Sequence, residues 1–129
     1  MKKLAYCLAA MAALLPALMA HHSFAAEYDS SKPVSLSNAT VTKIEWMNPH
    51  IWVYMDVKDA AGKVSKWECE GGPPNTLVRG GWTKSVVQAG AVISLEGTRA
   101  KDGTNTCNLR SITMADGRKL GAGSSEGRQ

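Results

Sequence analysis

Residues 50–57 alternate strictly between aliphatic side chains and polar or aromatic ones. A period of two residues is typical of a β-strand with one face buried. We therefore expect one face of this strand to line a core, through Ile51, Val53, Met55 and Val57. The opposite face carries His50, Trp52 and Tyr54. A strand this regular favours a β-sheet protein.

Four further segments have the composition and alternation of strands, namely residues 34–46, 63–70, 91–97 and 106–114. In the first of them the apolar phase changes between Val41 and Ile44, which predicts a β-bulge near Thr42-Lys43. In the last, a second phase change lies between Leu109 and Ile112. Bulges of this kind bend a strand strongly, as small barrels require.

The connections between these strands favour one fold class. After the third strand, Asn75 is suited to cap a short helix over residues 76–79, which Gly80-Gly81 would end. Asp102-Gly103 is a hairpin turn signal between the last two strands. We therefore predict a mostly β protein, a small five-stranded OB-like Greek-key barrel with one short helix between strands 3 and 4. An immunoglobulin-like sandwich is the alternative, although it needs about seven strands.

The first 20 residues have the organisation of a secretory signal peptide. Lys2-Lys3 precede a short apolar run, and Ala20 precedes the preferred cleavage site. Cleavage after Ala26 is the alternative, but it places bulky Phe24 three residues before the cut. The predicted organisation is a signal peptide (1–20), an extended N-terminal arm (21–33), an OB-like β-barrel domain (34–120) and a disordered tail (121–129).

Export predicts a periplasmic or secreted protein and an oxidising environment for Cys69 and Cys107. A disulfide between them is one interpretation, and two buried thiols are the other. After the signal peptide, no apolar segment is long enough to cross a membrane. We therefore expect no membrane association once the signal is removed.

The charge pattern bears on the partners. Removal of Lys2 and Lys3 lowers the formal net charge from +4 to +2, and the remaining basic residues are interspersed with acids. Nucleic-acid binding needs a clustered basic face, so we expect no nucleic-acid partner. The expected partner is an unknown ligand or a periplasmic protein, and the sequence leaves the oligomeric state open.

The histidines are His21, His22 and His50. Cleavage after Ala20 would make His21 the first residue, so that its α-amine and imidazole could chelate one metal ion together with His50, with His22 assisting. Nitrogen ligands of this kind suit Cu(II). We therefore predict copper as a cofactor. The alternative is a polar tail, with His50 only hydrogen-bonding across its turn.

The aromatic residues suggest a second kind of site. Trp52 and Tyr54 share the outward strand face and could form the aromatic surface on which OB-folds bind bases or sugars. In an exported protein, a sugar or a peptide is the expected ligand. We expect Trp46, Trp67 and Trp82 to close the core instead.

Signals for an enzyme are weak. The sequence contains no His-Glu-x-x-His or Cys-x-x-Cys pattern. Glu68 and Glu70 lie on one side of a strand, as two catalytic carboxylates would, but so do the acids of any polar edge. We expect a non-enzymatic binding module, and a pocket that placed these two carboxylates beside a histidine would argue for an enzyme.

Several short motifs, spread from His21 almost to Leu120, resemble those of a family of uncharacterised exported bacterial proteins. The motifs are His21-His22-Ser23-Phe24, Tyr28-Asp29, Val41 to Trp46, Asn48-Pro49-His50, Trp67 with Glu70, Leu77, Arg79 to Trp82, Gly90, Asp102-Gly103 and Asp116-Gly117-Arg118. The resemblance implies an exported single domain. It implies no activity and no catalytic residues.

Overall fold

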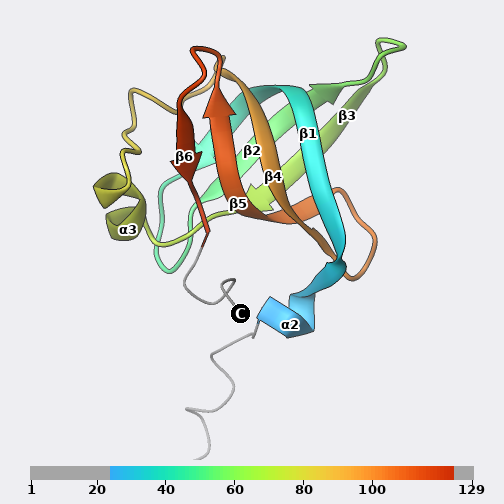
Figure 1. The fold of residues 1–129 in the computed structure, drawn as a ribbon, viewed down its shortest axis with the longest axis horizontal. Helices are drawn as coiled ribbons and strands as arrows, with labels where there is room; N and C mark the ends of the chain where they lie inside the picture. The colour runs from blue at the N-terminus through green and yellow to red at the C-terminus, as the bar shows by residue number, and fades with distance from the viewer. Residues whose placement is uncertain (1–23, 124–129) are drawn as a thin grey trace, which may run out of the picture.

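A computed structural model describes residues 24–123, and these residues are predominantly β-structure (Figure 1). The elements in chain order are α2 (Phe24–Glu27), β1 (Tyr28–Glu45), β2 (Trp52–Lys58), β3 (Val64–Glu70), α3 (Pro74–Arg79), β4 (Val92–Ala100), β5 (Thr106–Met114) and β6 (Lys119–Gly121). The described part of the chain therefore has six strands, one more than predicted. The short helix α3 lies between β3 and β4, as predicted.

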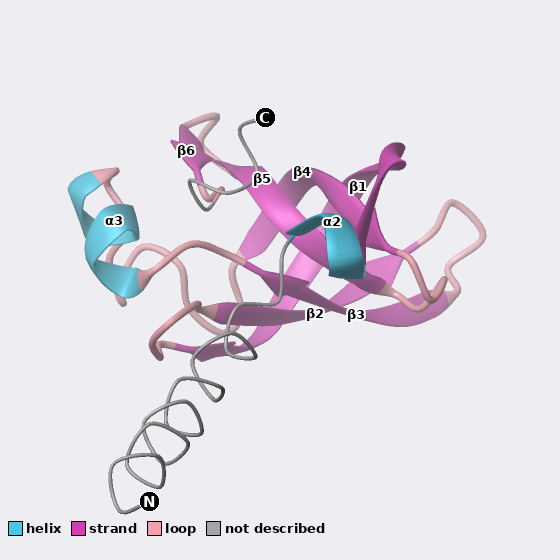
Figure 2. Cartoon of the chain, turned by 90° about the horizontal axis from the view of Figure 1, so that it is seen from below, coloured by secondary structure: helices cyan, strands magenta, loops and turns pink. Residues whose placement is uncertain are grey.

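The six strands form one sheet that curls until strands near opposite ends of the strand order pair with each other. The strand order is β3-β2-β1-β4-β5-β6, and β3 also pairs with β5. This last pairing is parallel, whereas every other pairing is antiparallel. Strands β1 to β5 are therefore linked in a closed circuit, and the long, strongly curved β1 is shared between β2 and β4 (Figures 1 and 2).

Both predicted phase changes correspond to register shifts. In the β1–β2 pairing, Val41 lies opposite Met55 and Lys43 lies opposite Tyr54, so Thr42 is the extra residue. In the β4–β5 pairing, Glu96 faces Ser111 and Gly97 faces Leu109, which leaves Arg110 as the extra residue of β5. Gly97 has no room for a side chain, because an added Cβ would collide with the carbonyl oxygen of Asn108.

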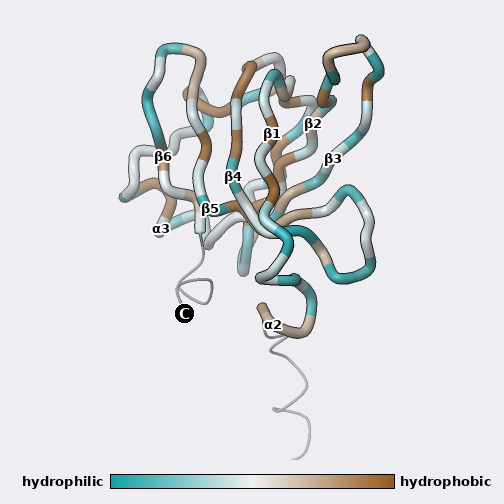
Figure 3. Tube along the Cα trace, turned by 45° about the vertical axis from the view of Figure 1, so that its right-hand side comes forward, coloured by the Kyte–Doolittle hydropathy of each residue, from teal (hydrophilic) through white to brown (hydrophobic). Residues whose placement is uncertain are grey.

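The core is the inner side of this closed sheet. The four residues predicted to face it are all buried, namely Ile51, Val53, Met55 and Val57. Ile93 and Leu95 of β4 and Leu109 and Ile112 of β5 complete the apolar interior, and Leu77 of α3 packs at one end. The alternation of apolar and polar residues along the strands is visible as alternating colour in Figure 3. Period-two patterning was therefore sufficient to identify the core face.

The N-terminal arm differs from its prediction. Residues 24–27 form one turn of helix instead of extended chain, and Tyr28 already pairs with Ala100 of β4. Strand β1 thus begins six residues before the predicted boundary at residue 34. The side chains of residues 30–33 are exposed, and the register shifts between Tyr28 and Pro33, so this part of the strand has no alternating pattern to recognise.

The C-terminal boundary also differs. Lys119 to Gly121 form β6, which pairs with Ser111 to Thr113 of β5, and Ala122 is fully buried. The first residues of the predicted tail therefore belong to the folded domain. Three residues are too few to show a period, and the glycines around them suggested a loop.

Helix α3 begins at Pro74, with Pro73 in the N-cap position and no side-chain cap. Asn75 therefore lies inside the helix, where the sequence predicted a cap. Proline suits the first helical turn because it has no N–H group to leave unpaired. Gly80 ends the helix as predicted.

Among residues 24–123, no helix has both the length and the apolar character needed to cross a membrane.

Candidate functional site

Three side chains from separate segments meet around one buried carboxylate. The Tyr28 hydroxyl donates a hydrogen bond of 2.5 Å to Oε2 of Glu70. The other oxygen, Oε1, contacts Nδ1 of His50. Glu70 is only 8% exposed and Tyr28 only 4%. We call Tyr28, His50 and Glu70 the Glu70 cluster.

The backbone around the cluster holds its members in place. Glu70 is the last residue of β3, where it pairs with Trp52 of β2 and Asn108 of β5. His50 lies just before β2. The neighbouring residue Ile51 donates to Gly72 O at 3.2 Å and accepts from Gly71 N at 2.9 Å. The segments that carry His50 and Glu70 are therefore hydrogen-bonded to each other on both sides of the contact.

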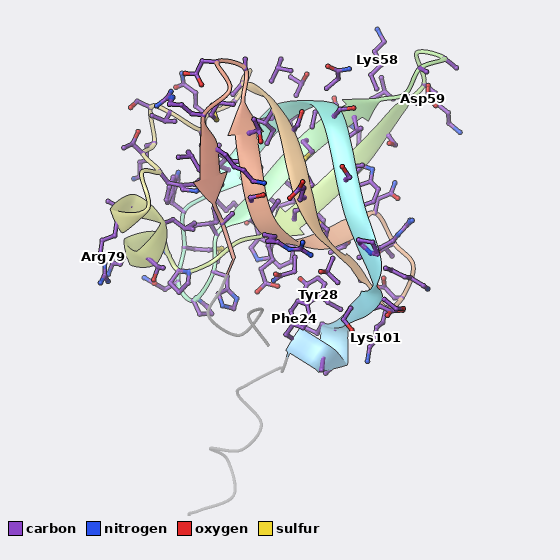
Figure 4. All side chains as sticks on the ribbon, in the orientation of Figure 1. Phe24, Tyr28, Lys58, Asp59, Arg79 and Lys101 are labelled. Carbon is purple, nitrogen blue, oxygen red and sulfur yellow. A yellow bond between two sulfur atoms is a disulfide. The ribbon has the colours of Figure 1, made fainter. Side chains whose placement is uncertain are left out.

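Helix α2 packs against Tyr28 of the Glu70 cluster. The Phe24 ring lies 5.4 Å from the Tyr28 ring and is nearly stacked on it, with an interplanar angle of 29°. Figure 4 shows both rings where α2 meets the lower end of β1. The start of the described chain is thus packed against a residue that contacts Glu70.

Burial, together with the hydrogen bond to Glu70, raises the pKa of Tyr28 far above its ordinary value near 10. The phenol therefore remains protonated and acts as a hydrogen-bond donor to the carboxylate. It is not available as a base at neutral pH.

This shift predicts a loss of stability at alkaline pH. Above about pH 10 the unfolded chain releases the Tyr28 proton whereas the folded chain retains it, so the free energy of unfolding must fall as the pH rises. We expect Tyr28→Phe to remove this part of the slope. Urea unfolding at several values between about pH 9 and pH 12 measures it. Equal slopes for wild type and Tyr28→Phe would contradict the prediction.

One imidazole nitrogen of the Glu70 cluster has no partner among the described residues. Because Nδ1 of His50 contacts the carboxylate, Nε2 is the nitrogen that remains, and within residues 24–123 it has no hydrogen-bond partner. The His50 side chain is 26% exposed, so this nitrogen is not sealed in the core. The other two predicted metal ligands, His21 and His22, lie outside the described residues. Within the described part of the chain, no three His, Cys, Asp or Glu side chains form a metal-binding group.

The predicted aromatic residues are partly buried and share the outward face of β2, but Tyr54 is already engaged. Its hydroxyl donates to Glu45 Oε2 at 3.2 Å, and Lys43 Nζ lies 5.3 Å from its ring centre. Tyr54 also lines a groove of about 420 Å³ together with Trp67, Glu68 and residues 104–106, where the loop before β5 meets that strand. Among residues 24–123, no aromatic ring stacks on the Trp52 side chain and no cationic group lies over it.

The other tryptophans occupy different environments. Trp82 is fully buried, and its Nε1 donates to Gly121 O at 2.9 Å. Trp46 packs edge-on against Trp82 at 6.3 Å. Trp67 is partly buried, and the guanidinium of Arg99 lies 5.3 Å from its ring. These three residues contact the core, as expected of side chains that close it.

The remaining predicted site residues lie along β3. Glu68 is exposed and its Oε1 accepts a 3.4 Å hydrogen bond from Thr106, whereas Glu70 is buried beside His50. Cys69, between them, is joined to Cys107 by a disulfide, and the two residues are direct partners in the parallel β3–β5 pairing. The structure therefore has the disulfide and not two free thiols.

Sequence reasoning did not identify Tyr28 as a site residue and interpreted Glu70 as part of a solvated strand face. The alternation in β3 correctly placed Glu70 opposite Cys69, and an outward position usually means exposure. Glu70 is buried because Tyr28 and His50 cover it. The histidine just before β2 was the one signal in the sequence, and only the strand pairing brings Tyr28, His50 and Glu70 together.

Comparisons with known proteins give a family and a fold. A family of unknown function, DUF6152, matches residues 8–109. No curated protein matches the chain. A similar solved structure is that of the mitochondrial single-stranded DNA-binding protein Rim1 from S. cerevisiae, with a TM-score of 0.52 and 9% identity over 65% of this chain and 93% of that chain. Single-stranded DNA-binding proteins of this class are OB-folds, so the comparison supports an OB-like fold.

Proposed function

The chain belongs to the DUF6152 family of unknown function, and we propose that it is an exported, periplasmic OB-like barrel that binds copper. His50 provides one ligand through Nε2. His21 provides its α-amine and imidazole once the signal peptide has been removed, and His22 assists. The observation that carries this proposal is the contact between His50 Nδ1 and the buried carboxylate of Glu70.

Metal-binding histidines usually donate their second ring N–H to a carboxylate or carbonyl group. Such a partner fixes the tautomer, orients the ring and makes the metal-binding nitrogen more basic. Glu70 stands in this relation to His50, and the Tyr28 hydroxyl in turn holds Glu70. A histidine that only hydrogen-bonds across its own turn would not need a partner 20 residues away in another strand.

The position of Phe24 supports the participation of the arm. Phe24 stacks on Tyr28, and Tyr28 and His50 contact the two oxygens of the same carboxylate. His21 is only three residues before Phe24, and an extended chain covers roughly 3.4 Å per residue. The N-terminal ligands are therefore tethered within about 10 Å of Phe24. This is short enough for a shared site with metal–nitrogen bonds of about 2 Å.

Ligand binding by Trp52 and Tyr54 is the alternative function, and the contacts favour it less. The Tyr54 ring and hydroxyl are both occupied by neighbouring side chains. The same outward region carries Glu45, Asp56 and Glu68 as well as Lys43 and Lys66, so it is not the clustered basic face that nucleic-acid binding needs. We therefore propose no nucleic-acid partner. The name of the similar DNA-binding protein describes that protein, and at 9% identity the likeness concerns the fold.

Calorimetric titration with Cu(II) tests the proposal. The processed protein that begins at His21 is expected to bind one equivalent. Addition of a single alanine before His21 removes the α-amine from its position and is expected to weaken binding strongly, as is His50→Ala. Equal Cu(II) affinity for the processed and the extended proteins would contradict the proposal.

The role of Glu70 has a matched control in the chain. Glu70→Gln is expected to weaken Cu(II) binding by about 10- to 100-fold, the usual effect of removing such a supporting carboxylate. A glutamine cannot offer one acceptor oxygen to Tyr28 and another to His50. Glu68→Gln, two residues away on the same strand and exposed, is expected to have no effect.

A further inference from the structure

A second groove lies next to the Glu70 cluster but is lined by none of its three residues, and it has a volume of about 390 Å³. Its lining includes Phe24 of α2, Leu77 of α3, Thr98 of β4, and Asn108 and Arg110 of β5. Figure 2, which is seen from below relative to Figure 1, shows α2, β5 and β6. We call this feature the Asn108 groove. Its volume lies near the lower end of the range of small-molecule sites.

Two of the lining residues are polar, nearly buried and unpaired. Asn108 is 8% exposed and Thr98 is 9% exposed, and they are direct partners in the β4–β5 pairing. Neither side chain makes a hydrogen bond within residues 24–123, yet no completely enclosed side-chain polar atom there lacks a partner. Their polar atoms therefore reach the groove. The two side chains lie side by side in the groove, so their polar atoms are available to hydrogen-bond a ligand with complementary groups.

Arg110 adds a positive charge at the same place. It is the extra residue of the β5 bulge, and bulges commonly redirect a side chain beside a functional site. Its backbone oxygen accepts from Ala122 N at 2.9 Å, which fixes this part of β5 against the segment after β6. Within the described residues its guanidinium forms no ion pair. Arg118, by contrast, is paired with Asp116 at 2.7 Å.

The donors in the groove define the ligand chemistry. A guanidinium offers only donors, an asparagine amide offers two, and a threonine hydroxyl offers one. Arg110, Asn108 and Thr98 therefore provide donors for a carboxylate, while the partly exposed Phe24 provides apolar surface for a hydrocarbon group. The nearby carboxylate of Glu70 is already bonded to Tyr28 and His50.

We propose that the Asn108 groove is a binding site for a small organic carboxylate with a hydrocarbon body. The proposal uses no residue of the Glu70 cluster, so it does not depend on copper binding. A variant that no longer binds Cu(II) is expected to bind the carboxylate still, and a variant that no longer binds the carboxylate is expected to bind Cu(II) still.

Calorimetric titration of the processed protein with benzoate tests this proposal. Benzamide has the same shape without the charge, and inorganic phosphate has the charge without the hydrocarbon. We expect saturable binding of benzoate and at least about tenfold weaker binding of benzamide, because hydrogen bonds to a charged group are the stronger ones. Equal binding of benzoate and benzamide, no binding of benzoate, or binding of phosphate alone would each overturn the proposal.

Substitutions assign the site. Arg110 is exposed, so Arg110→Gln leaves the fold intact and is expected to weaken benzoate binding about tenfold or more. Thr98→Val, which keeps the side-chain shape, is expected to weaken it less. Arg118→Gln is the matched control for loss of one arginine and is expected to leave the affinity unchanged. Equal effects of Arg110→Gln and Arg118→Gln would show that benzoate binds elsewhere and would overturn the assignment.

Discussion

Replacement of both Cys69 and Cys107 by alanine is expected to lower the free energy of unfolding by about 4 kcal/mol. The disulfide joins residues 38 positions apart, and a loop of this length restricts the unfolded chain substantially. Both cysteines are fully buried, so the lost sulfur atoms add a small packing term. Urea denaturation of the wild type and the double variant measures the difference.

The position of the disulfide in the sheet is a second reason to expect a loss of stability when it is removed. The β3–β5 pairing closes the circuit of strands and involves only three residue pairs, with Cys69 and Cys107 in the middle. The cross-link therefore holds the shortest pairing in the closed circuit of β1 to β5. Wild-type protein treated with a reductant is expected to lose a similar amount of stability, which separates the cross-link from the packing term. A loss of less than about 1 kcal/mol in both experiments would contradict this account.

The same cross-link affects the candidate copper site. Glu70 follows Cys69 directly and pairs with Asn108, which follows Cys107. The disulfide therefore fixes the strand ends that carry the carboxylate of the Glu70 cluster and the amide of the Asn108 groove. Reduction of the disulfide is therefore expected to weaken both Cu(II) binding and carboxylate binding, even under conditions in which the protein stays folded.

Features with a local period were predictable from the sequence. The inward residues of β2 and both bulges follow from the alternation of neighbouring side chains, and the structure places them accordingly. Strand β6 and the first residues of β1 were not predictable in this way. Each depends on a partner strand far away in the sequence, and neither has an alternating pattern of its own.

The site was predictable only in part, for the same reason. His50 was recognised by its residue type and its place beside a strand. Its partner Glu70 is 20 residues away, and Tyr28 is 42 residues from Glu70. A sequence pattern assigns each of these residues to an element, but only strand pairing brings them together. The register of β2 against β3 places His50 near Glu70, and the pairing of Tyr28 with Ala100 of β4 places the tyrosine. The polar pair Thr98 and Asn108 likewise arises from the register of β4 against β5.

Trp82→Ala is expected to lower the free energy of unfolding by about 3–5 kcal/mol, as large-to-small changes of a buried aromatic residue do. Trp82 is among the largest fully buried side chains of the described chain. Trp46 packs against it, so the cavity would also remove support from a second tryptophan. The control is Trp52→Ala, at a partly buried position on the outward face of β2. This substitution is expected to lower the free energy of unfolding by less than half as much.

Trp82→Phe separates packing from hydrogen bonding. The Nε1 of Trp82 donates to Gly121 O, the last residue of β6, and phenylalanine keeps an aromatic ring but cannot make this bond. Because the carbonyl would lose its partner, we expect a cost of about 1–3 kcal/mol in addition to a smaller cavity term. Hydrogen exchange should show faster opening of β6 than of β2 in this variant. Equal protection of the two strands would mean that the pairing with β5 alone holds β6, and that the Trp82 hydrogen bond contributes nothing to its position.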